Sequence, residues 1–262
     1  AVAVAFSVLA FFLSVSRMVY LKEILALALL TVLFATTSLQ AAPLAPSQIK
    51  TETPLTVVEL YTSQGCSSCP PADTLLGELA NQPNILALSF HVDYWDYIGW
   101  KDVFARTENT ARQKAYATVA GRRSIYTPQM VVGGLHDVVG THPRDVEDLI
   151  RKDRNRASPI KLSAARKGNQ LRLEASTSAP FSPPLDVQLV RLRPNASVTV
   201  NRGENAGKIL DYHNIVTDWQ VIARWDGRAP LQITQDISGT EPVVVILQHP
   251  GPGAIEAALR LR

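Results

Sequence analysis

Two cysteines, Cys66 and Cys69, are separated by two serines in the segment VVELYTSQGCSSCPPAD, and the 262-residue chain has no others. The apolar run 55–61 predicts a buried strand, and prolines such as those after Cys69 are tolerated in the first turn of a helix. We therefore expect both cysteines in a strand-to-helix turn. Backbone N–H groups and the positive end of the helix dipole would then face the Cys66 sulfur, lower the pKa of its thiol and yield a nucleophilic thiolate.

Three chemistries fit a cysteine pair with this spacing. A disulfide over a loop of about four residues removes little chain entropy, about 1.9 kcal/mol against about 3 kcal/mol for a loop of about 15 residues, so it is a weak structural staple. Zinc needs two further ligands, and of the five histidines only His91 is placed to help. We favour redox chemistry, with Cys66 attacking and Cys69 resolving. The expected cofactor set is the redox-active Cys66–Cys69 disulfide alone, with no metal.

Composition places the chain among globular proteins. Hydrophobic residues make up 46% and charged residues 19%, and the length suits one large domain or two modest ones. The formal net charge is only +3, and no basic face is apparent. Nucleic acid is therefore not an expected partner.

Residues 1–42 are expected to lie outside the fold. Met18, Lys22, the apolar run 24–35 and the small and polar residues 36–42 have the layout of a secretory signal peptide, with residues 1–17 as upstream sequence. A longer signal anchor is the alternative. The apolar run is too short to span a bilayer comfortably, so no stable membrane insertion is expected after cleavage near Ala42. Export would place the cysteines in the periplasm or outside the cell, where a disulfide persists.

The first half of the mature chain alternates strand and helix patterns. A second buried strand is expected at 85–91, a helix at 101–120, a hairpin of 129–132 with 136–139, and a last helix from about Pro143. Residues 54–155 therefore predict an α/β domain. Residues 158–262 instead hold short β-rich runs, at 160–165, 171–177, 185–192, 196–200 and 243–248, which predict a small antiparallel, sandwich-like domain.

Acidic and aromatic residues accompany the two buried strands. Asp93 and Trp95 belong to the aromatic stretch 92–100, which either caps the core or walls a cleft beside the cysteines. Asp93, or Glu59 in the first strand, would be a proton relay if it lay near a buried thiol, although such acids are more often solvated or paired. The segment RGENAGK at 202–208 is interpreted as a tight charged hairpin, with a functional loop as the alternative.

This order of elements resembles a thioredoxin fold, in which a cis proline faces the disulfide. Thr127 and Pro128 match that proline and the residue before it, and the resemblance implies that they hold the backbone of a docking substrate chain. An ordinary trans proline at the start of an edge strand is the alternative. Two serines replace the Gly-Pro that is usual between the cysteines of thioredoxins, and two prolines follow Cys69. The direction of redox transfer is therefore open.

The segments QGCSSCPPAD, HVDYWDYIGWKD, YTPQMVVGG and RGENAGK resemble, more closely, the domain of unknown function 1223 family of secreted bacterial proteins. The resemblance covers nearly all of residues 54–262 and implies a thioredoxin-like domain followed by a β-rich extension. The family name implies no activity, which must be argued from the site.

These patterns together predict an exported thiol-disulfide oxidoreductase. Its partners would be the thiols and disulfides of exported proteins and a redox partner protein. A non-catalytic binding protein on a thioredoxin scaffold is one alternative. A Cu(I)-binding chaperone that uses both thiolates is another, because soft ligands select that ion.

Overall fold

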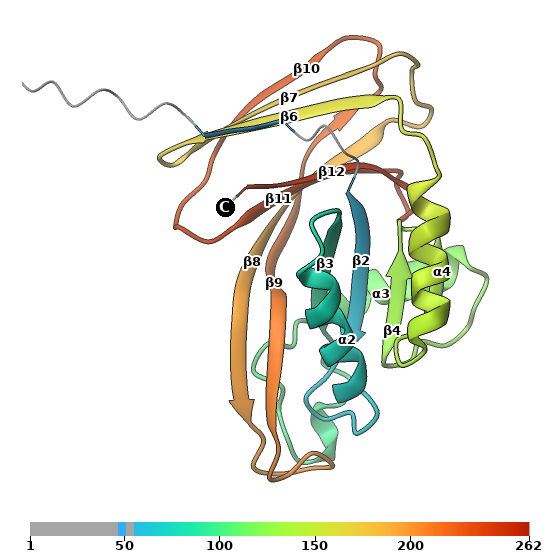
Figure 1. Ribbon diagram of the computed structural model, residues 1–262, viewed down its shortest axis with the longest axis vertical. Coiled ribbons are helices and arrows are strands. Elements are labelled where there is room, and N and C mark those ends of the chain that lie inside the picture. The colour runs from blue at the N-terminus through green and yellow to red at the C-terminus, as the bar shows by residue number, and fades with distance from the viewer. Residues whose placement is uncertain (1–46, 51–54, 262) are drawn as a thin grey trace, which may run out of the picture. The chain divides into compact units, whose positions relative to one another are not determined.

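The computed structural model describes residues 47–50 and 55–261 (Figure 1). By its internal contacts the chain divides into Ala1–Ala45 and a compact unit, Pro46–Arg262. The expected signal peptide and upstream sequence, residues 1–42, lie outside the described residues. Within the described part of the chain, no helix has the length and apolar character needed to cross a membrane.

A mixed eight-stranded sheet is the main layer of the unit, with strand order β12-β11-β8-β9-β3-β2-β4-β5. Strands β2 and β3 run parallel, and β4 and β5 continue the sheet in antiparallel fashion on the other side of β2. The bounds of these strands are β2 Thr56–Thr62, β3 Ile85–His91, β4 Gln129–Val132, β5 His136–Val139, β8 Leu185–Thr199, β9 Ile209–Trp225, β11 Val243–Gln248 and β12 Ile255–Leu261.

A second, four-stranded antiparallel sheet has the order β1-β6-β7-β10. Its strands are β1 Ser47–Lys50, β6 Ile160–Lys167, β7 Gln170–Thr177 and β10 Leu231–Asp236. Apolar residues of β6 and β7 share one core cluster with residues of β8, β11 and β12. The small sheet and one end of the large sheet thus form a sandwich.

The predicted α/β fold class with a small antiparallel β-rich part is confirmed, but the β-rich half differs from the expectation in one respect. Strands β8, β9, β11 and β12 extend the large sheet instead of standing apart from it, with β9 paired in parallel to β3 at Ser89 and Ile215. The domain limits 54–155 and 158–262 stay a prediction.

Helices cover both faces of β2, which explains why every residue of that strand is buried. α2 (Pro70–Ala80) and α4 (Pro143–Arg154) lie on one face of the sheet and α3 (Thr107–Val119) on the other (Figure 1). Val58 and Leu60 pack with residues of α2 and α4, while Val57 and Tyr61 pack on the opposite face with Tyr116 of α3. A strand buried on both faces is a continuous apolar run. Burying one such leucine stabilises the fold by about 2 kcal/mol.

The helix expected at 101–120 begins only at Thr107. The chain before it forms turns because Asp102 is turned inward, where its carboxylate accepts hydrogen bonds from the N–H groups of Phe104 and Gln64. A short 3-10 helix, η1 (Asp96–Ile98), occupies the aromatic stretch before these turns. The residues 92–106 therefore form a long loop at the carboxyl end of β3.

Candidate functional site

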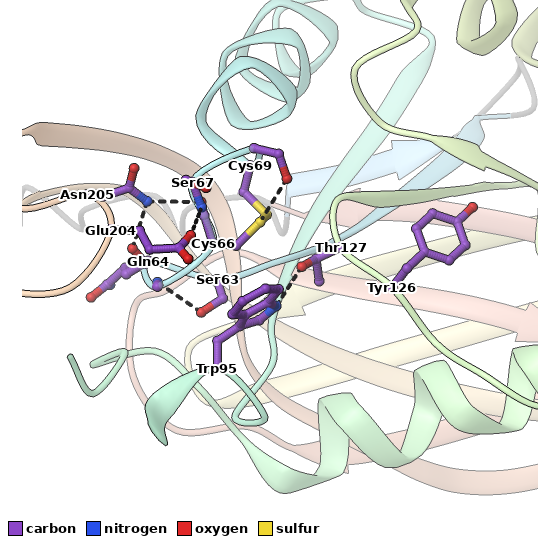
Figure 2. The surroundings of a disulfide bond; sticks show 12 residues. Ser63, Gln64, Cys66, Ser67, Cys69, Trp95, Tyr126, Thr127, Glu204 and Asn205 are labelled. Atoms are coloured by element: carbon purple, nitrogen blue, oxygen red, sulfur yellow. Dashed lines mark hydrogen bonds between the residues drawn. A yellow bond between two sulfur atoms is a disulfide. The ribbon is translucent and has the colours of Figure 1, made fainter. Parts of the chain in front are cut away.

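The two cysteines are joined in a disulfide where β2 turns into α2 (Figure 2). Their Cα atoms are 5.4 Å apart, and Cys69 is the N-cap residue of the helix. Cys66 and Cys69 are only 1% and 0% exposed, whereas Ser67 and Ser68 between them are exposed. The C-x-x-C disulfide is therefore covered on the sulfur side and open on the serine side.

The first turn of α2 offers the disulfide few free donors. Pro70 and Pro71 occupy its first two positions and carry no N–H. The N–H groups of Ala72 and Asp73 both donate to the Cys69 carbonyl, at 2.8 and 3.1 Å. This differs from the expectation that helix-end N–H groups face the Cys66 sulfur, because two of them are missing and the next two are occupied.

The backbone N–H groups of the two cysteines are also occupied by carbonyls of the turn. The Cys66 N–H donates to the Ser63 carbonyl at 3.1 Å, and the Cys69 N–H donates to the Cys66 carbonyl at 3.2 Å. The Cys66 sulfur lies 3.4 Å from the Ser68 hydroxyl. That hydroxyl is therefore the group best placed to stabilise a thiolate on Cys66.

The tip of the hairpin between β8 and β9 reaches the cysteine turn from the other half of the chain (Figure 2). Asn205 is fully buried, and its side-chain amide donates to the carbonyls of Gln64 at 3.0 Å and Cys66 at 2.9 Å. The Glu204 carboxylate accepts a hydrogen bond from the Ser67 N–H at 3.2 Å. The segment 202–208 is thus a hairpin, as interpreted from sequence, and it contacts the residues around the disulfide.

Trp95 and the proline loop lie near the disulfide as well (Figure 2). The peptide bond between Thr127 and Pro128 is cis, as the resemblance implied. The Trp95 indole N–H donates to the Thr127 hydroxyl at 2.7 Å, which links the aromatic stretch to this loop. A Cβ atom on Gly65 would lie 3.2 Å from Trp95 Cβ, so Trp95 also packs on the turn before Cys66. Tyr97, 80% exposed, stacks on Trp95.

A buried polar network holds the loop 92–106 under the cysteine turn. Asp102 Oδ2 accepts the Gln64 N–H at 2.8 Å and lies 2.7 Å from His91 Nδ1, and the Asp102 and His91 side chains are both fully buried. The Trp100 indole N–H donates to Gln64 Oε1 at 2.8 Å. In the described part of the chain, no three His, Cys, Asp or Glu side chains are grouped to hold a metal ion.

Asp73 is a second buried acid at this site, four residues after Cys69 in α2. Burial raises the pKa of Asp73 well above its ordinary value; the Thr62 side chain opposes this shift, and the charge of Asp102 adds to it. Burial, together with the charges of Asp73 and Asp102, also raises the pKa of Tyr212. The Tyr212 ring lies 4.6 Å from the His91 ring. These side chains form one cluster beneath the turn, in which the Asp73 oxygens, His91 Nε2 and the Tyr212 hydroxyl make no hydrogen bond of ordinary geometry with described residues.

Glu59, a predicted proton relay, lies on the other face of β2. Arg112 binds both of its carboxylate oxygens, at 2.8 and 2.9 Å, and the hydroxyls of Tyr61 and Tyr116 donate to it as well. Its neighbours Val58 and Leu60 point toward α2, so Glu59 points away from that helix. Its carboxylate is therefore occupied by an ion pair.

Asp93, the other predicted relay, is bound by two threonine side chains from the first turn of α3. The hydroxyls of Thr107 and Thr110 donate to its two oxygens at 2.7 and 2.6 Å. The bond from Thr110 is the main reason why its pKa is lowered. Asp93 is therefore an ionised, partly exposed carboxylate, and the acid with a raised pKa near the disulfide is Asp73, which sequence reasoning did not single out.

Comparison with known proteins identifies the family. A family model described as "Protein of unknown function (DUF1223)" matches residues 57–248. The chain belongs to this family. The DUF1223 match contains both cysteines, the cis proline and the 202–208 hairpin, so the site described above lies wholly within the family's own region. The comparison with curated proteins found no match.

Two solved structures resemble the chain. A crystal structure of a protein from Agrobacterium tumefaciens is 32% identical, with a TM-score of 0.70 over 80% of this chain and 95% of that chain. HBP35 of Porphyromonas gingivalis is 13% identical, with a TM-score of 0.59 over 80% of this chain and 75% of that chain. The second likeness concerns the fold alone.

Proposed function

We propose that this DUF1223 protein is an exported thiol-disulfide oxidoreductase. The observation that carries the proposal is the Cys66–Cys69 disulfide at the start of α2, with the cis peptide of Thr127 and Pro128 nearby. A four-residue loop with two exposed serines contributes little to stability as a crosslink. The signal-like pattern of residues 1–42 supports export.

The arrangement of the first four strands of the large sheet supports a thioredoxin-like interpretation. Strands β3 and β2 are parallel and joined through α2, and β4 and β5 follow as an antiparallel pair beyond β2. This is the order of elements that the sequence resemblance implies. Under this proposal Thr127 and Pro128 hold the backbone of the substrate chain next to the disulfide.

The proposed reaction is an exchange of two disulfides. The Cys66 thiolate attacks one sulfur of a substrate disulfide, forms a mixed disulfide and releases the other substrate sulfur as a thiolate. Cys69, once deprotonated, then attacks the Cys66 sulfur, which closes the Cys66–Cys69 disulfide and releases the second substrate thiolate. Two electrons pass from the protein to the substrate, and the reverse sequence oxidises a substrate dithiol.

Asp73 is the group that we assign to the proton of Cys69. Residues four apart in a helix share one face, and the Asp73 N–H already donates to the Cys69 carbonyl. A carboxyl whose pKa is raised holds its proton to higher pH and can exchange it with a nearby thiol, whereas an ordinary exposed aspartate stays ionised. Glu59 and Asp93 are engaged by other groups, so we assign neither to this step.

Trapping of the mixed disulfide tests the proposal. The Cys69→Ser variant should accumulate covalent complexes with exported proteins through Cys66, and a reducing agent should release them. The Cys66→Ser variant is the matched control, since it keeps one thiol in the same turn but should trap few partners. Equal and negligible trapping by both variants, with both folded, would contradict the proposal.

A second candidate function is the binding of a small amphipathic ligand away from the disulfide. A cavity of about 620 Å³ is lined by β6, β7, β10 and β12 and contains Lys161, Glu174 and Glu256 among apolar residues. Ligand pockets commonly have volumes of about 300–1,000 Å³.

The Cu(I) alternative would rest on the two thiolates of the reduced protein. Mass spectrometry of the native protein, before and after addition of Cu(I), separates these two alternatives.

A further inference from the structure

The acidity of the attacking thiol decides which way a C-x-x-C pair transfers electrons. A thiolate that is strongly stabilised by N–H donors and a helix dipole favours the dithiol form and makes the pair an oxidant. Here Pro70 and Pro71 remove two donors from the helix end. The donors that remain in the first turn, on Ala72 and Asp73, are bound to the Cys69 carbonyl.

The tip of the β8–β9 hairpin also disfavours a thiolate on Cys66. Glu204 receives the Ser67 N–H, which is the donor next to Cys66 in the chain, and brings a carboxylate to the same turn. A carboxylate near a thiol disfavours the second negative charge. Asn205 fixes this position, because its buried amide holds the carbonyls of Gln64 and Cys66.

We propose that the Cys66–Cys69 pair is built to favour its disulfide form and therefore to act as an electron donor to the disulfides of exported proteins. Glu204 is the positioning residue, since it acts through the Ser67 amide and through the negative charge that it places at Ser67, the residue after Cys66. The inference rests on the proposed function and adds the direction of transfer. It assigns the role to a residue from the β-rich half of the chain.

The direction defines the substrate class and the co-reactant. The protein dithiol gives two electrons to a substrate disulfide, which leaves as a dithiol, and Cys66 and Cys69 end as the disulfide. A second dithiol, supplied by a redox partner protein, must then attack the Cys66–Cys69 bond and carry away the oxidising equivalents. The substrates are therefore exported proteins with oxidised cysteine pairs.

Equilibration of the purified wild-type protein with glutathione tests the direction. In a buffer at about millimolar total concentration, with reduced glutathione in about tenfold excess over oxidised glutathione, a reducing pair stays mainly oxidised and an oxidising pair becomes mainly reduced. We expect more than about nine-tenths of the protein to keep the Cys66–Cys69 disulfide, as measured by mass-tagging of free thiols. A mainly reduced protein overturns the inference.

The Glu204→Gln variant tests the role of the carboxylate. Glutamine keeps an oxygen acceptor for the Ser67 N–H and removes the charge. Because Ser67 is exposed and the charge is screened by water, we expect loss of the charge to lower the pKa of the Cys66 thiol only slightly. In the reduced protein the rate of Cys66 alkylation should therefore rise about threefold at pH 6, where thiolate is scarce, and stay unchanged well above the pKa.

Asp226→Asn is the matched control for the loss of one negative charge. Asp226 follows the far end of β9, so a strand of 17 residues, about 50 Å at about 3.3 Å per residue, separates it from the hairpin tip. Asp226 Oδ1 accepts a hydrogen bond from the backbone N–H of Arg228, and the side-chain oxygen of asparagine can accept the same bond. Among the described residues, the other charged or titratable groups around the turn include Lys208, Asp102 with its partner His91, and Asp73, and neither variant alters them. The control should leave the alkylation rate unchanged.

The outcomes separate the two proposals. A wild-type disulfide that dithiothreitol does not reduce in the native protein contradicts the oxidoreductase itself. A disulfide that exchanges readily but is mainly reduced in the glutathione buffer contradicts only the direction. Equal alkylation rates for Glu204→Gln and wild type at pH 6 contradict the role of Glu204. A threefold rise for Glu204→Gln, absent in Asp226→Asn, supports it.

Discussion

Two buried acids lie on opposite sides of β2, Glu59 in the strand itself and Asp73 in α2, and their surroundings are opposite. Glu59 is fully buried and receives hydrogen bonds from Arg112, Tyr61 and Tyr116. Asp73, in α2, is buried and has no cationic partner among the residues that the structure describes, and its burial raises its pKa. A buried charge with a complete set of partners supports the fold, whereas a buried acid without a cation is a sign of function.

Truncation of the chain should reduce stability most, because it removes residues that pack around Glu59 and Arg112. A fragment of residues 54–155 lacks Gln248, whose side chain bonds Arg112 and Tyr116, and lacks the β11 and β12 residues that share a core cluster with β2. We expect the fragment to show no cooperative unfolding transition in urea. A cooperative transition with a native-like circular dichroism spectrum would instead support the predicted domain limit.

Arg112→Met should be the most damaging single substitution on the Glu59 face. It leaves the Glu59 carboxylate buried without its cation, which costs about 3–5 kcal/mol of the free energy of unfolding. The double variant with Glu59→Leu is the control and should recover much of that loss, because no buried charge remains. Urea denaturation measures both, and a loss below about 1 kcal/mol in the single variant would contradict a structural role for the pair.

Asn205→Ala should have the next largest effect, on the disulfide side. The carbonyls of Gln64 and Cys66 would lose their shared buried donor, which costs about 1–3 kcal/mol. Ser197→Ala, an exposed position on the same hairpin, is the control and should change the stability little. Equal effects of the two variants would argue that the hairpin tip does not hold the cysteine turn.

Asp73→Asn should change the pH dependence of stability in a defined direction. An acid whose pKa is raised in the folded state lends stability below its unfolded pKa and loses it as the pH rises through the folded pKa. The variant should therefore match the wild type near pH 4 and become the more stable protein above it, by at most about 1.4 kcal/mol per pH unit. Thermal unfolding at a series of pH values gives the difference.

Asp93→Asn should change the pH dependence of stability in the opposite direction to Asp73→Asn. The pKa of Asp93 is lowered, chiefly by Thr110, so its contribution is present above the unfolded pKa and is lost as the pH falls through the folded pKa. This variant should be less stable than the wild type at neutral pH and approach it in acid. The same sign for Asp73→Asn and Asp93→Asn would contradict the distinction between the two acids.

Local sequence patterns predicted the elements that carry the cysteines. Strands β3, β4, β5 and β11 have the predicted bounds, since their apolar runs and turn glycines are local signals. Strands β1, β9, β10 and β12 were missed. Burial is irregular along β9 and β12, and β10 has no fully buried residue, so these three strands lack a clear apolar pattern. The runs 185–192 and 196–200 form one strand, β8, which continues through Pro194.

The site was only partly predictable, for a physical reason. The cysteines and the cis proline have short, local signatures. Asn205 and Cys66 are 139 residues apart in the chain, and no local pattern indicates that they touch. Asp73 also gave no signal, since an aspartate in a first helical turn usually faces solvent and complements the helix dipole. Its burial follows from the packing of α2, which sequence periodicity did not resolve at that position.

Alkylation of the reduced wild-type protein, followed by mass spectrometry of each cysteine, tests the central claim most directly. Both cysteines are buried and each adjoins an exposed serine, but only the Cys66 sulfur lies beside the Ser68 hydroxyl, whereas Cys69 is the N-cap residue of α2. We predict that iodoacetamide modifies Cys66 at least about tenfold faster than Cys69 at neutral pH. Equal or negligible modification of both thiols in the folded protein would contradict the account.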